Sequence, residues 1–311
     1  GRPVFRVGRS RARAPPAADG RGLELVNDDR TVGVVGLGLL GSAISERLLH
    51  AGLHVVGYDI DSARREELAS RGGLALDSAS AVAHDAARLL LSLPTSDIAR
   101  RVINEIAPRL REGAIVVDTT TGDPAEMTAI GAKLAGQGIS YLDATIGGSS
   151  RQVRDRDVVV MAGGARNAFD ACRDIFESFA RETFHVGPCG SGATMKLVVN
   201  LVLGLNRAAL AEGLAFARGL GLDLPATLKV LKAGPAWSRA MDIKGEKMLS
   251  GDFNPQARLS QHLKDVRLIL STGGSTGARL PLSEVHRRLL EQAERSGFGD
   301  ADNSAIIKAF D

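Results

Sequence analysis

Lys196 and Asn200 are the residues of this 311-residue chain whose types and spacing best suit acid–base chemistry. They lie four residues apart in the apolar segment ATMKLVVNLVLGLN, so on a helix they share one face about one turn apart. Desolvation by apolar neighbours lowers the pKa of a lysine toward the operating pH of a general acid or base. The pair therefore indicates proton transfer at a substrate oxygen, with Asn200 orienting the lysine or holding a substrate hydroxyl. A snorkelling lysine beside a structural asparagine is the alternative interpretation.

A glycine-rich turn near the start of the chain is the second candidate site. Its pattern is GxGxxG, which is weak alone because glycines collect in many turns, but here it ends a β-branched run and opens a segment with helical spacing. In that context the first glycine permits a tight turn, the second a close approach to a pyrophosphate, and the third close helix–strand packing. The helix N-terminus would then bind the phosphates. The candidate cofactor-binding residues are Gly36, Leu37, Gly38, Leu39, Leu40 and Gly41.

An acidic residue completes this dinucleotide signature. Asp59 ends a second apolar run and lies 18 residues beyond Gly41, where a carboxylate accepts hydrogen bonds from an adenosine ribose. Together with Asp61 it would repel a 2′-phosphate, so the expected cofactor is NAD. Arg64 and Arg65 keep NADP open as the less favoured cofactor. A solvated turn acid is the alternative for Asp59.

Strand-like and helical segments alternate over the first half of the chain. This alternation is typical of βαβ units around a mostly parallel sheet. Strands are predicted at 31–36, 54–59, 89–94, 114–120, 139–145 and 158–164, and helices at 39–52, 61–73, 96–110, 123–137 and 166–180.

The pattern changes after Gly187, where strand signals stop and a long apolar helix, 193–218, is predicted. At 1.5 Å per residue such a helix is about 40 Å long, so we expect it to join two domains and to offer surface to another subunit. The fold class is therefore α/β, with a Rossmann-type N-terminal domain, a long interdomain helix and an all-α C-terminal domain. The predicted domains are a disordered or extraneous extension at 1–30, an NAD-binding domain at 31–188 and a helical substrate and oligomerisation domain at 189–311.

Charge and composition exclude several other classes. Residues 1–30 hold seven Arg and four acids, a net charge of +3 that equals the net charge of the whole chain, so the remainder is balanced. A nucleic-acid-binding face needs concentrated positive charge, and none is expected. No uninterrupted apolar run reaches the ~18 residues of a membrane span. The Arg-rich start is either an upstream extension or a transit peptide.

Cysteine and histidine usage points to a reducing compartment and to no metal. Two cysteines occur, Cys172 and Cys189, which is too few for a disulfide framework, and the six histidines show no ligand spacing. A cytoplasmic location is expected.

The chain resembles the β-hydroxyacid dehydrogenases, the family of 3-hydroxyisobutyrate dehydrogenase and tartronate semialdehyde reductase. The resemblance covers about Thr31 to Phe310 and rests on VVGLGLLGSAI at 34–44 and an ungapped GxGxxxKxxxN at 190–200. It implies an NAD(P)-dependent enzyme that transfers a hydride to or from a small 3-hydroxy acid, with Lys196 as the proton-transfer residue and Asn200 in contact with the substrate. The expected partner is a small-molecule hydroxy-acid substrate, with no nucleic acid and no membrane. A homodimer or homotetramer is expected.

Further cofactor contacts follow from the same resemblance. SLPTSDI at 92–98 resembles the family's Leu-Pro loop, which implies that Leu93 and Pro94 contact the cofactor. DTTTGDP at 118–124 implies a contact from Thr121 near the nicotinamide ribose. LKDVRLIL at 263–270 implies that Lys264 reaches the cofactor from the second domain, with Asp265 in support.

The substrate loop departs from the family's D-A-P-V-S-G-G pattern, because the chain reads DATIGGSS at 143–150. Gly147 and Gly148 are expected to supply N–H donors to the substrate carboxylate, and Ser149 or Ser150 the hydroxyl. Arg151 either pairs with a second anionic group of the substrate or is a solvated arginine.

The single tryptophan, Trp237, is a further substrate-binding candidate, because the corresponding region of the family lies near the substrate. A lone aromatic residue among helices is more commonly part of the core. Two rival functions stay open beside the dehydrogenase: a non-catalytic dinucleotide-binding protein of the same fold, and an imine reductase. The presence of Lys196 argues against both.

Overall fold

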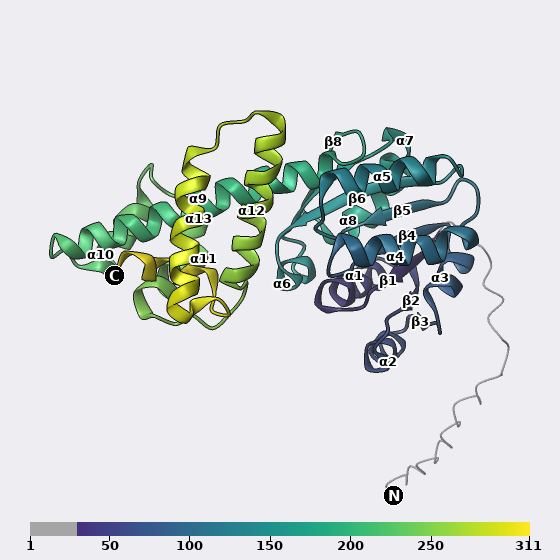
Figure 1. The fold of residues 1–311 in the computed structure, drawn as a ribbon. Helices are drawn as coiled ribbons and strands as arrows, with labels where there is room; N and C mark the ends of the chain where they lie inside the picture. Colours follow the sequence, from purple (N-terminus) through teal and green to yellow (C-terminus); the bar gives the residue numbers. More distant parts are fainter. Residues whose placement is uncertain (1–29) are drawn as a thin grey trace, which may run out of the picture.

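The computed structural model describes residues 30–311 as an α/β part and a helical part joined by one long helix, α9 (Ser191–Gly219) (Figure 1). Most of the predicted N-terminal extension, residues 1–29, lies outside the described residues. The predicted fold class, a Rossmann-type domain with a mostly parallel sheet followed by helices, is confirmed.

The α/β part is built on one eight-stranded sheet with the order β3-β2-β1-β4-β5-β6-β7-β8. Neighbouring strands are parallel throughout, except that β6 and β7 are antiparallel. The strand order reverses beside β1, which is where doubly wound sheets bind dinucleotides. The strands are β1 (Thr31–Val35), β2 (His54–Tyr58), β3 (Leu74–Ala75), β4 (Arg88–Leu91), β5 (Ile115–Asp118), β6 (Ser140–Gly147), β7 (Val159–Gly163) and β8 (Glu182–Gly187).

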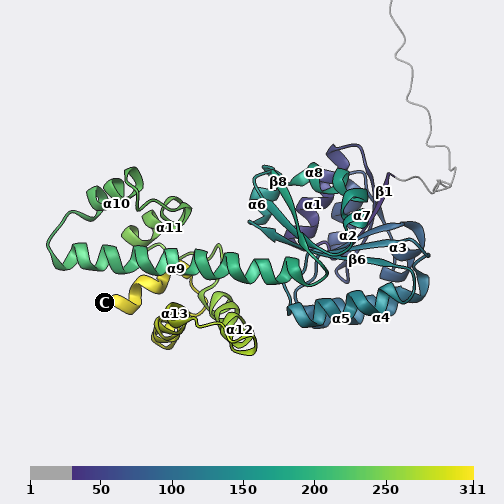
Figure 2. The ribbon, with the colours of Figure 1, turned by 90° about the horizontal axis from the view of Figure 1, so that it is seen from above.

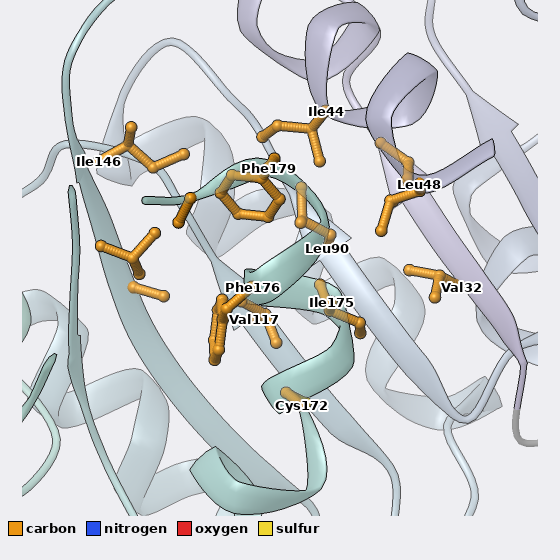
Figure 3. Close-up of a cluster of buried hydrophobic side chains, with 14 of the residues drawn as sticks. Val32, Ile44, Leu48, Leu90, Val117, Ile146, Cys172, Ile175, Phe176 and Phe179 are labelled. Carbon is orange, nitrogen blue, oxygen red and sulfur yellow. The ribbon is translucent and has the colours of Figure 1, made fainter. Parts of the chain in front are cut away.

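Helices cover both faces of this sheet, so its strands are apolar on both sides. On one face Phe176 and Phe179 of α8 pack against Val32, Leu90 and the side chains of α1, as the close-up in Figure 3 shows. Burial of such aromatic side chains from water stabilises the fold by about 1.5–3 kcal/mol each. The sheet helices are α1 (Leu39–His50), α2 (Ser62–Ser70), α3 (Ala79–Asp85), α4 (Ser96–Ile106), α5 (Pro124–Ala135), α6 (Ser150–Arg154), α7 (Arg166–Ala171) and α8 (Arg173–Phe179).

Four short elements of this part, β3, α3, α6 and β8, were not predicted. The five-residue helix α6 forms because Ser149 and Gln152 make a capping box at its start. The outermost strand, β8, is only half-buried, so it lacks the apolar run that marks the inner strands.

The helical part surrounds the C-terminal two thirds of α9. Viewed from above, α10 and α11 lie on one side of α9 and α12 and α13 on the other, with the C-terminus beside it (Figure 2). A separate core forms here around Leu214, Leu263 and Leu290. The elements are α10 (Leu224–Ala233), α11 (Arg239–Ser250), α12 (Leu259–Thr276), α13 (Pro281–Ala293), a π-helical turn at Glu294–Phe298 and a final 3₁₀ segment at Asn303–Phe310.

By length and mean hydropathy α9 could cross a membrane, and 44% of its most apolar window is buried in the protein. It contacts β6, β7 and β8 at its start and the helical part further on. An exposed strip of apolar side chains remains, including Val198 and Val202. Packing inside a two-part protein therefore accounts for much of the apolar character of α9.

The start of α9 is fixed by the sheet. Gly190 precedes the helix without a side-chain cap of its own, and the carboxylate of Asp143 on β6 replaces one, accepting the N–H groups of Gly190 and Ala193 at 2.8 Å each. The hydroxyl of Thr145 donates to the carbonyl of Gly192 at 2.9 Å. These contacts hold the first turn of α9 directly against β6.

The contact between α9 and β6 leaves no room for a side chain at Gly192. A Cβ atom there would lie 2.0 Å from the backbone oxygen of Asp143 and 2.6 Å from that of Met161, so the helix would have to move. We expect Gly192→Ala to lower the free energy of unfolding by more than about 2 kcal/mol in urea titrations. Gly213 on the same helix is the control, because a Cβ there meets nothing within 4 Å, and alanine should raise stability by up to about 1 kcal/mol. Equal effects of the two changes would contradict this account.

Candidate active site

The predicted cofactor residues gather at one edge of the sheet. Except for Lys264 on α12, they follow the carboxyl ends of β1, β2, β4 and β5. The predicted substrate loop follows β6, and since these five strands are parallel, all the loops lie at the same edge. This edge faces the junction with the helical part.

The glycine-rich turn fits a pyrophosphate. Gly36 has a φ of +92°, and a Cβ on it would lie 2.3 Å from the backbone oxygen of Ser92. A Cβ on Gly41 would lie 1.9 Å from the oxygen of Gly36, which is the close packing expected of the third glycine. At Gly38 a Cβ would meet nothing within 4 Å, and the N-terminus of α1 has no side-chain cap. Open space in front of uncapped helix N–H groups is what a bound phosphate requires.

Asp59 lies directly beside this turn. Its carboxylate accepts the N–H of Leu37 at 2.7 Å and that of Asp61 at 2.9 Å, and so ties the end of β2 to the glycine turn. Arg65 donates to the backbone oxygen of Asp59 at 2.7 Å and lies over the ring of Tyr58. Two of the four acceptor positions of the carboxylate remain for a ligand.

The loops after β4 and β5 contact each other. The N–H of Leu93 donates to the hydroxyl of Thr120 at 3.3 Å, which brings Leu93 and Pro94 next to the loop that carries Thr121. Thr121 is exposed and lines the large cleft described next. The two loops that carry these three predicted residues therefore lie side by side.

A cleft of about 830 Å³ lies between the sheet edge and the helical part. It is electropositive, because six cationic side chains and two carboxylates line it. Within residues 30–311 no group of three or more His, Cys, Asp or Glu side chains is placed to hold a metal. The charged side chains of the cleft are Arg151, Lys196, Arg207, Arg239, Lys244, Arg258, Asp157 and Asp265.

Lys196 and Asn200 both face this cleft from α9. The ammonium of Lys196 donates to the backbone oxygen of Ile146 on β6 at 2.8 Å, and the amide of Asn200 donates to the carboxylate of Asp265 at 3.2 Å. Burial lowers the pKa of Lys196, and the negative charge of Asp265 opposes that shift. Burial also raises the pKa of Asp265, against the positive charges around it. The arrangement holds a lysine of reduced basicity at the cleft wall.

The predicted substrate loop lies at the end of β6, beside Lys196. Gly147 ends the strand, and Gly148 and Ser149 line the cleft. The N–H and hydroxyl of Ser149 both donate to the side chain of Gln152, at 3.0 and 3.1 Å. The Arg151 side chain is 92% exposed and makes only a long contact, 3.9 Å, with Asp155. The structure thus places Arg151 on the rim of the cleft, in solvent.

Two predicted site residues of the helical part, Lys264 and Trp237, lie outside the cleft lining. On the α/β side the lining also omits the glycine turn, Asp59, Leu93, Pro94 and Gly147. Lys264 is exposed on α12, next to Asp265 in sequence, and its charge lowers the pKa of that carboxyl. Trp237 is 53% exposed between α10 and α11 and donates to the carboxylate of Asp242 at 3.0 Å. The expectation that a lone tryptophan belongs to the core is therefore wrong, because the helices here pack through aliphatic side chains.

The role of Asp143 as a helix cap is not among the predictions made from the sequence. Its partners lie 47 and 50 residues away, so no local pattern reveals the contact. Asp118 lies opposite Asp143 on β5, accepts the hydroxyl of Tyr141 at 2.8 Å, and has its pKa raised to about 6 by burial. Two buried carboxylates thus lie side by side on β5 and β6.

Comparison with known proteins places this geometry in a family. The family described as the NAD binding domain of 6-phosphogluconate dehydrogenase matches residues 31–187, and that described as NAD-binding of NADP-dependent 3-hydroxyisobutyrate dehydrogenase matches residues 190–310. The chain belongs to the β-hydroxyacid dehydrogenase family. Members of this family are NAD(P)-dependent oxidoreductases of small hydroxy acids, so a nicotinamide dinucleotide is the cofactor class.

Individual β-hydroxyacid dehydrogenases are similar along nearly their whole length. The chain is 28% identical to a 2-(hydroxymethyl)glutarate dehydrogenase of Eubacterium barkeri, covering 90% of this chain and 94% of that protein. It is 28% identical to an L-threonate dehydrogenase of Cupriavidus necator, covering 90% and 96%. The crystal structure of a 3-hydroxyisobutyrate dehydrogenase from Salmonella typhimurium superposes with a TM-score of 0.80 at 27% identity, covering 89% of this chain and 99% of that one.

Asp265 provides a test of the electrostatics at Lys196. Its carboxylate stabilises the ammonium form, so Asp265→Asn should lower the pKa of Lys196 further while keeping an oxygen acceptor for Asn200. Because only the free amine is acetylated, the pH dependence of Lys196 acetylation, followed by peptide mass spectrometry, reports this pKa. We expect the midpoint to move to lower pH.

Asp157→Asn is the matched control, because Asp157 lines the same cleft but pairs with Arg181 and Arg239. It should leave the Lys196 midpoint in place. An upward shift in Asp265→Asn, or the same downward shift in both variants, would contradict the assignment.

Proposed function

We propose that this chain transfers a hydride between NAD and a small 3-hydroxy acid, or the corresponding semialdehyde or keto acid, with Lys196 as the proton-transfer residue. The observation that carries the proposal is the position of the Lys196 ammonium. It lies in the cleft wall, fixed at 2.8 Å from the backbone of β6, the strand that also leads into the substrate loop.

The proton step follows from the chemistry of Lys196. A bound nicotinamide dinucleotide would supply or accept the hydride. In the reducing direction the ammonium of Lys196 gives a proton to the oxygen that becomes the hydroxyl, and in the oxidising direction the free amine takes the hydroxyl proton. Reduction of its pKa by burial brings both forms closer to neutral pH. The amide of Asn200, one helical turn from Lys196 and held by Asp265, is assigned to hold the same oxygen.

The substrate carboxylate is assigned to the loop after β6. Gly148 and Ser149 line the cleft there, and Gly147 precedes them at the strand end. The Ser149 hydroxyl can turn from Gln152 to a carboxylate, because a hydroxyl donates only one hydrogen bond. Trp237 is retained as a more remote substrate candidate, since it lies in the segment leading to α11, which lines the cleft.

The cofactor is assigned to the glycine-rich turn, with Leu93, Pro94 and Thr121 along one wall and Lys264 approaching from the helical part. NAD is favoured over NADP because Asp59 is aimed at the turn and the neighbouring arginines are engaged. Arg64 pairs with Glu67 at 3.5 Å, and Arg65 is held by the backbone of Asp59.

Residues 31–188 form the NAD-binding domain in this proposal, and 189–311 the helical domain, which fits the end of β8 and the start of α9. A homodimer or homotetramer is supported by the exposed apolar strip on α9, which includes Val198, Val202 and Phe216. A cytoplasmic location is supported by two free thiols, Cys172 and Cys189.

Loss of Lys196 should stop proton transfer and leave cofactor binding intact. We expect Lys196→Ala to lower turnover of the preferred hydroxy acid, measured by absorbance at 340 nm, by about 10²–10⁴-fold. Lys196→Arg is the matched variant, because it keeps the positive charge but cannot release a proton near neutral pH. It should be as slow as the alanine variant. Near-normal turnover in Lys196→Arg would show that the charge, not the proton, matters.

Asp59 should decide the choice between NAD and NADP. Asp59→Asn keeps an acceptor for the Leu37 N–H but removes the charge that would repel a 2′-phosphate. In fluorescence titrations we expect the ratio of NADP to NAD affinity to rise by about tenfold, as charge repulsion of roughly 1–2 kcal/mol is relieved. Equal losses for both cofactors would assign Asp59 to the turn alone.

A further inference from the structure

A second basic group lies deep in the cleft, on the same face of α9 as the catalytic candidates. Arg207 is 11 residues beyond Lys196, about three turns of helix, and both side chains line the cleft. Arg207 is only 5% exposed and, Asn206 apart, its neighbours on α9 are apolar. Burial lowers its pKa to about 10, against the opposing charges of Asp302 and Asp265, so its guanidinium is protonated at neutral pH.

The buried guanidinium lacks a complete set of partners. The Nη2 atom of Arg207 is buried and has no hydrogen-bond partner among the described residues. Two neighbours in the cleft lining share this property: His262 Nε2 and Asn303 Oδ1 are also buried without a partner there. Each unsatisfied buried group costs stability, so three in one wall indicate a place that is completed by a ligand. Of the three, Arg207 Nη2 and His262 Nε2 can donate to an anion, whereas Asn303 Oδ1 is an acceptor.

These groups are held by packing against α9. A Cβ on Gly204 would lie 2.5 Å from the Nε2 of His262 and 2.6 Å from the Cε1 of His286, so glycine makes room for both rings. Burial and the charge of Arg207 lower the pKa of His286 to about 4 and hold that of His262 well below its usual range. Both rings are therefore neutral, and the Nε2 of His262 donates a hydrogen bond in one of its tautomers.

The local charges sum to one positive charge. Lys244 also lines the cleft, but its ammonium lies 2.8 Å from both carboxylate oxygens of Asp302. Burial alone would raise the pKa of Asp302, yet Lys244 and nearby N–H groups lower it to about 2, so the pair is ionised. Asp265 acts on both Lys196 and Arg207, so the three cations Lys196, Arg207 and Lys244 face the two carboxylates Asp265 and Asp302. The net charge of +1 matches a monoanion and not a dianion.

We propose that Arg207, with the His262 imidazole, binds a carboxylate at the end of the substrate remote from its reacting carbon. The inference rests on the proposed function and narrows its substrate class to hydroxy acids, or their semialdehydes, that carry a distal carboxylate. Arg207 is then a specificity-determining residue. It takes the place that the sequence left open for Arg151, whose side chain is 92% exposed.

Burial of Arg207 lowers the stability of the fold, and a role in ligand binding explains why the residue is there. A buried guanidinium with an unsatisfied N–H group disfavours the folded chain, and a methionine of similar length would fill the same space without that penalty. A purely structural arginine would instead stabilise the fold through its partners. Arg207→Met should therefore keep or raise the melting temperature while it removes the recognition of a distal carboxylate.

The test compares matched acids by calorimetry on the full chain, with and without NAD. The probes are succinate, glutarate and adipate, each against the monoacid that lacks the far carboxylate: propionate, butyrate and valerate. We expect one dicarboxylate to bind at least about tenfold more tightly than its monoacid, as a charge-assisted hydrogen bond in a buried site gives. In Arg207→Met this ratio should fall to near one, and in Arg207→Lys it should be partly kept.

Arg151→Met is the control, because it removes one positive charge from the rim of the same cleft and should preserve the ratio. No preference in the unmodified protein, a preference that survives in Arg207→Met, or equal losses in Arg151→Met would each overturn the proposal. If Arg207→Met does not fold, the ratio of dicarboxylate to monoacid affinity is compared between Arg207→Gln and the unmodified protein, and an unchanged ratio overturns the proposal. Tighter binding of 4-phosphonobutyrate than of glutarate would assign the site to a phosphate group instead.

Binding does not require turnover, so the two proposals can fail separately. A preference for dicarboxylates that depends on Arg207, together with no oxidation or reduction of any hydroxy acid, would reject the dehydrogenase and keep the subsite. Turnover without that preference would reject the subsite alone.

Discussion

The junction between one strand and one helix positions the whole site. The carboxylate of Asp143 on β6 caps α9, so the first turn of the helix cannot rotate or slide against the sheet. The same strand then supplies the backbone oxygen of Ile146 to Lys196 and continues into Gly148 and the substrate loop. Strand, cap, lysine and loop are thus set by a single length of backbone. A small residue is required where the two elements touch, which explains Gly192 of the GxGxxxK motif, whereas Gly190 has a φ of +91° and lies against Thr128 of α5.

The electrostatics of the site depend on a few buried charged groups, only some of which form ion pairs. Asp118 and Asp143 are buried opposite each other on β5 and β6, and burial raises the pKa of both. In the cleft Lys196 has a distant carboxylate and no direct ion pair, which leaves it able to exchange a proton. Lys244, by contrast, is neutralised by Asp302. The cleft therefore contains one cation that is neutralised by an ion pair, Lys244, and one that is available to a ligand, Lys196.

Much of this arrangement could be predicted from local patterns. The β-branched run 31–35 ends at a glycine turn, and the apolar segment around Lys196 forms one helix of 29 residues, as its composition indicated. Lys196 and Asn200 share the cleft because a spacing of four places them on one helix face. The edge strand β8 escaped prediction because it is half-buried and lacks an apolar pattern.

Other features depend on tertiary contacts that no local pattern contains. Asp143 finds its partners 47 and 50 residues away, through the crossing of β6 and α9. Trp237 has no periodic neighbours that would mark it as exposed. Arg207 did leave a signal, a lone cation inside an apolar helix, but its meaning required the cleft and the unpaired atoms around it.

The most direct test of the central claim is chemical rescue of Lys196→Ala with primary amines. If the ammonium of Lys196 gives the proton to the substrate oxygen, small amines that enter the cavity left by the side chain should restore carbonyl reduction. The restored rate should depend on the pKa of the amine and increase with its concentration. An alanine variant that no amine restores, while still binding cofactor and substrate normally, would contradict the role of Lys196 as the proton-transfer residue.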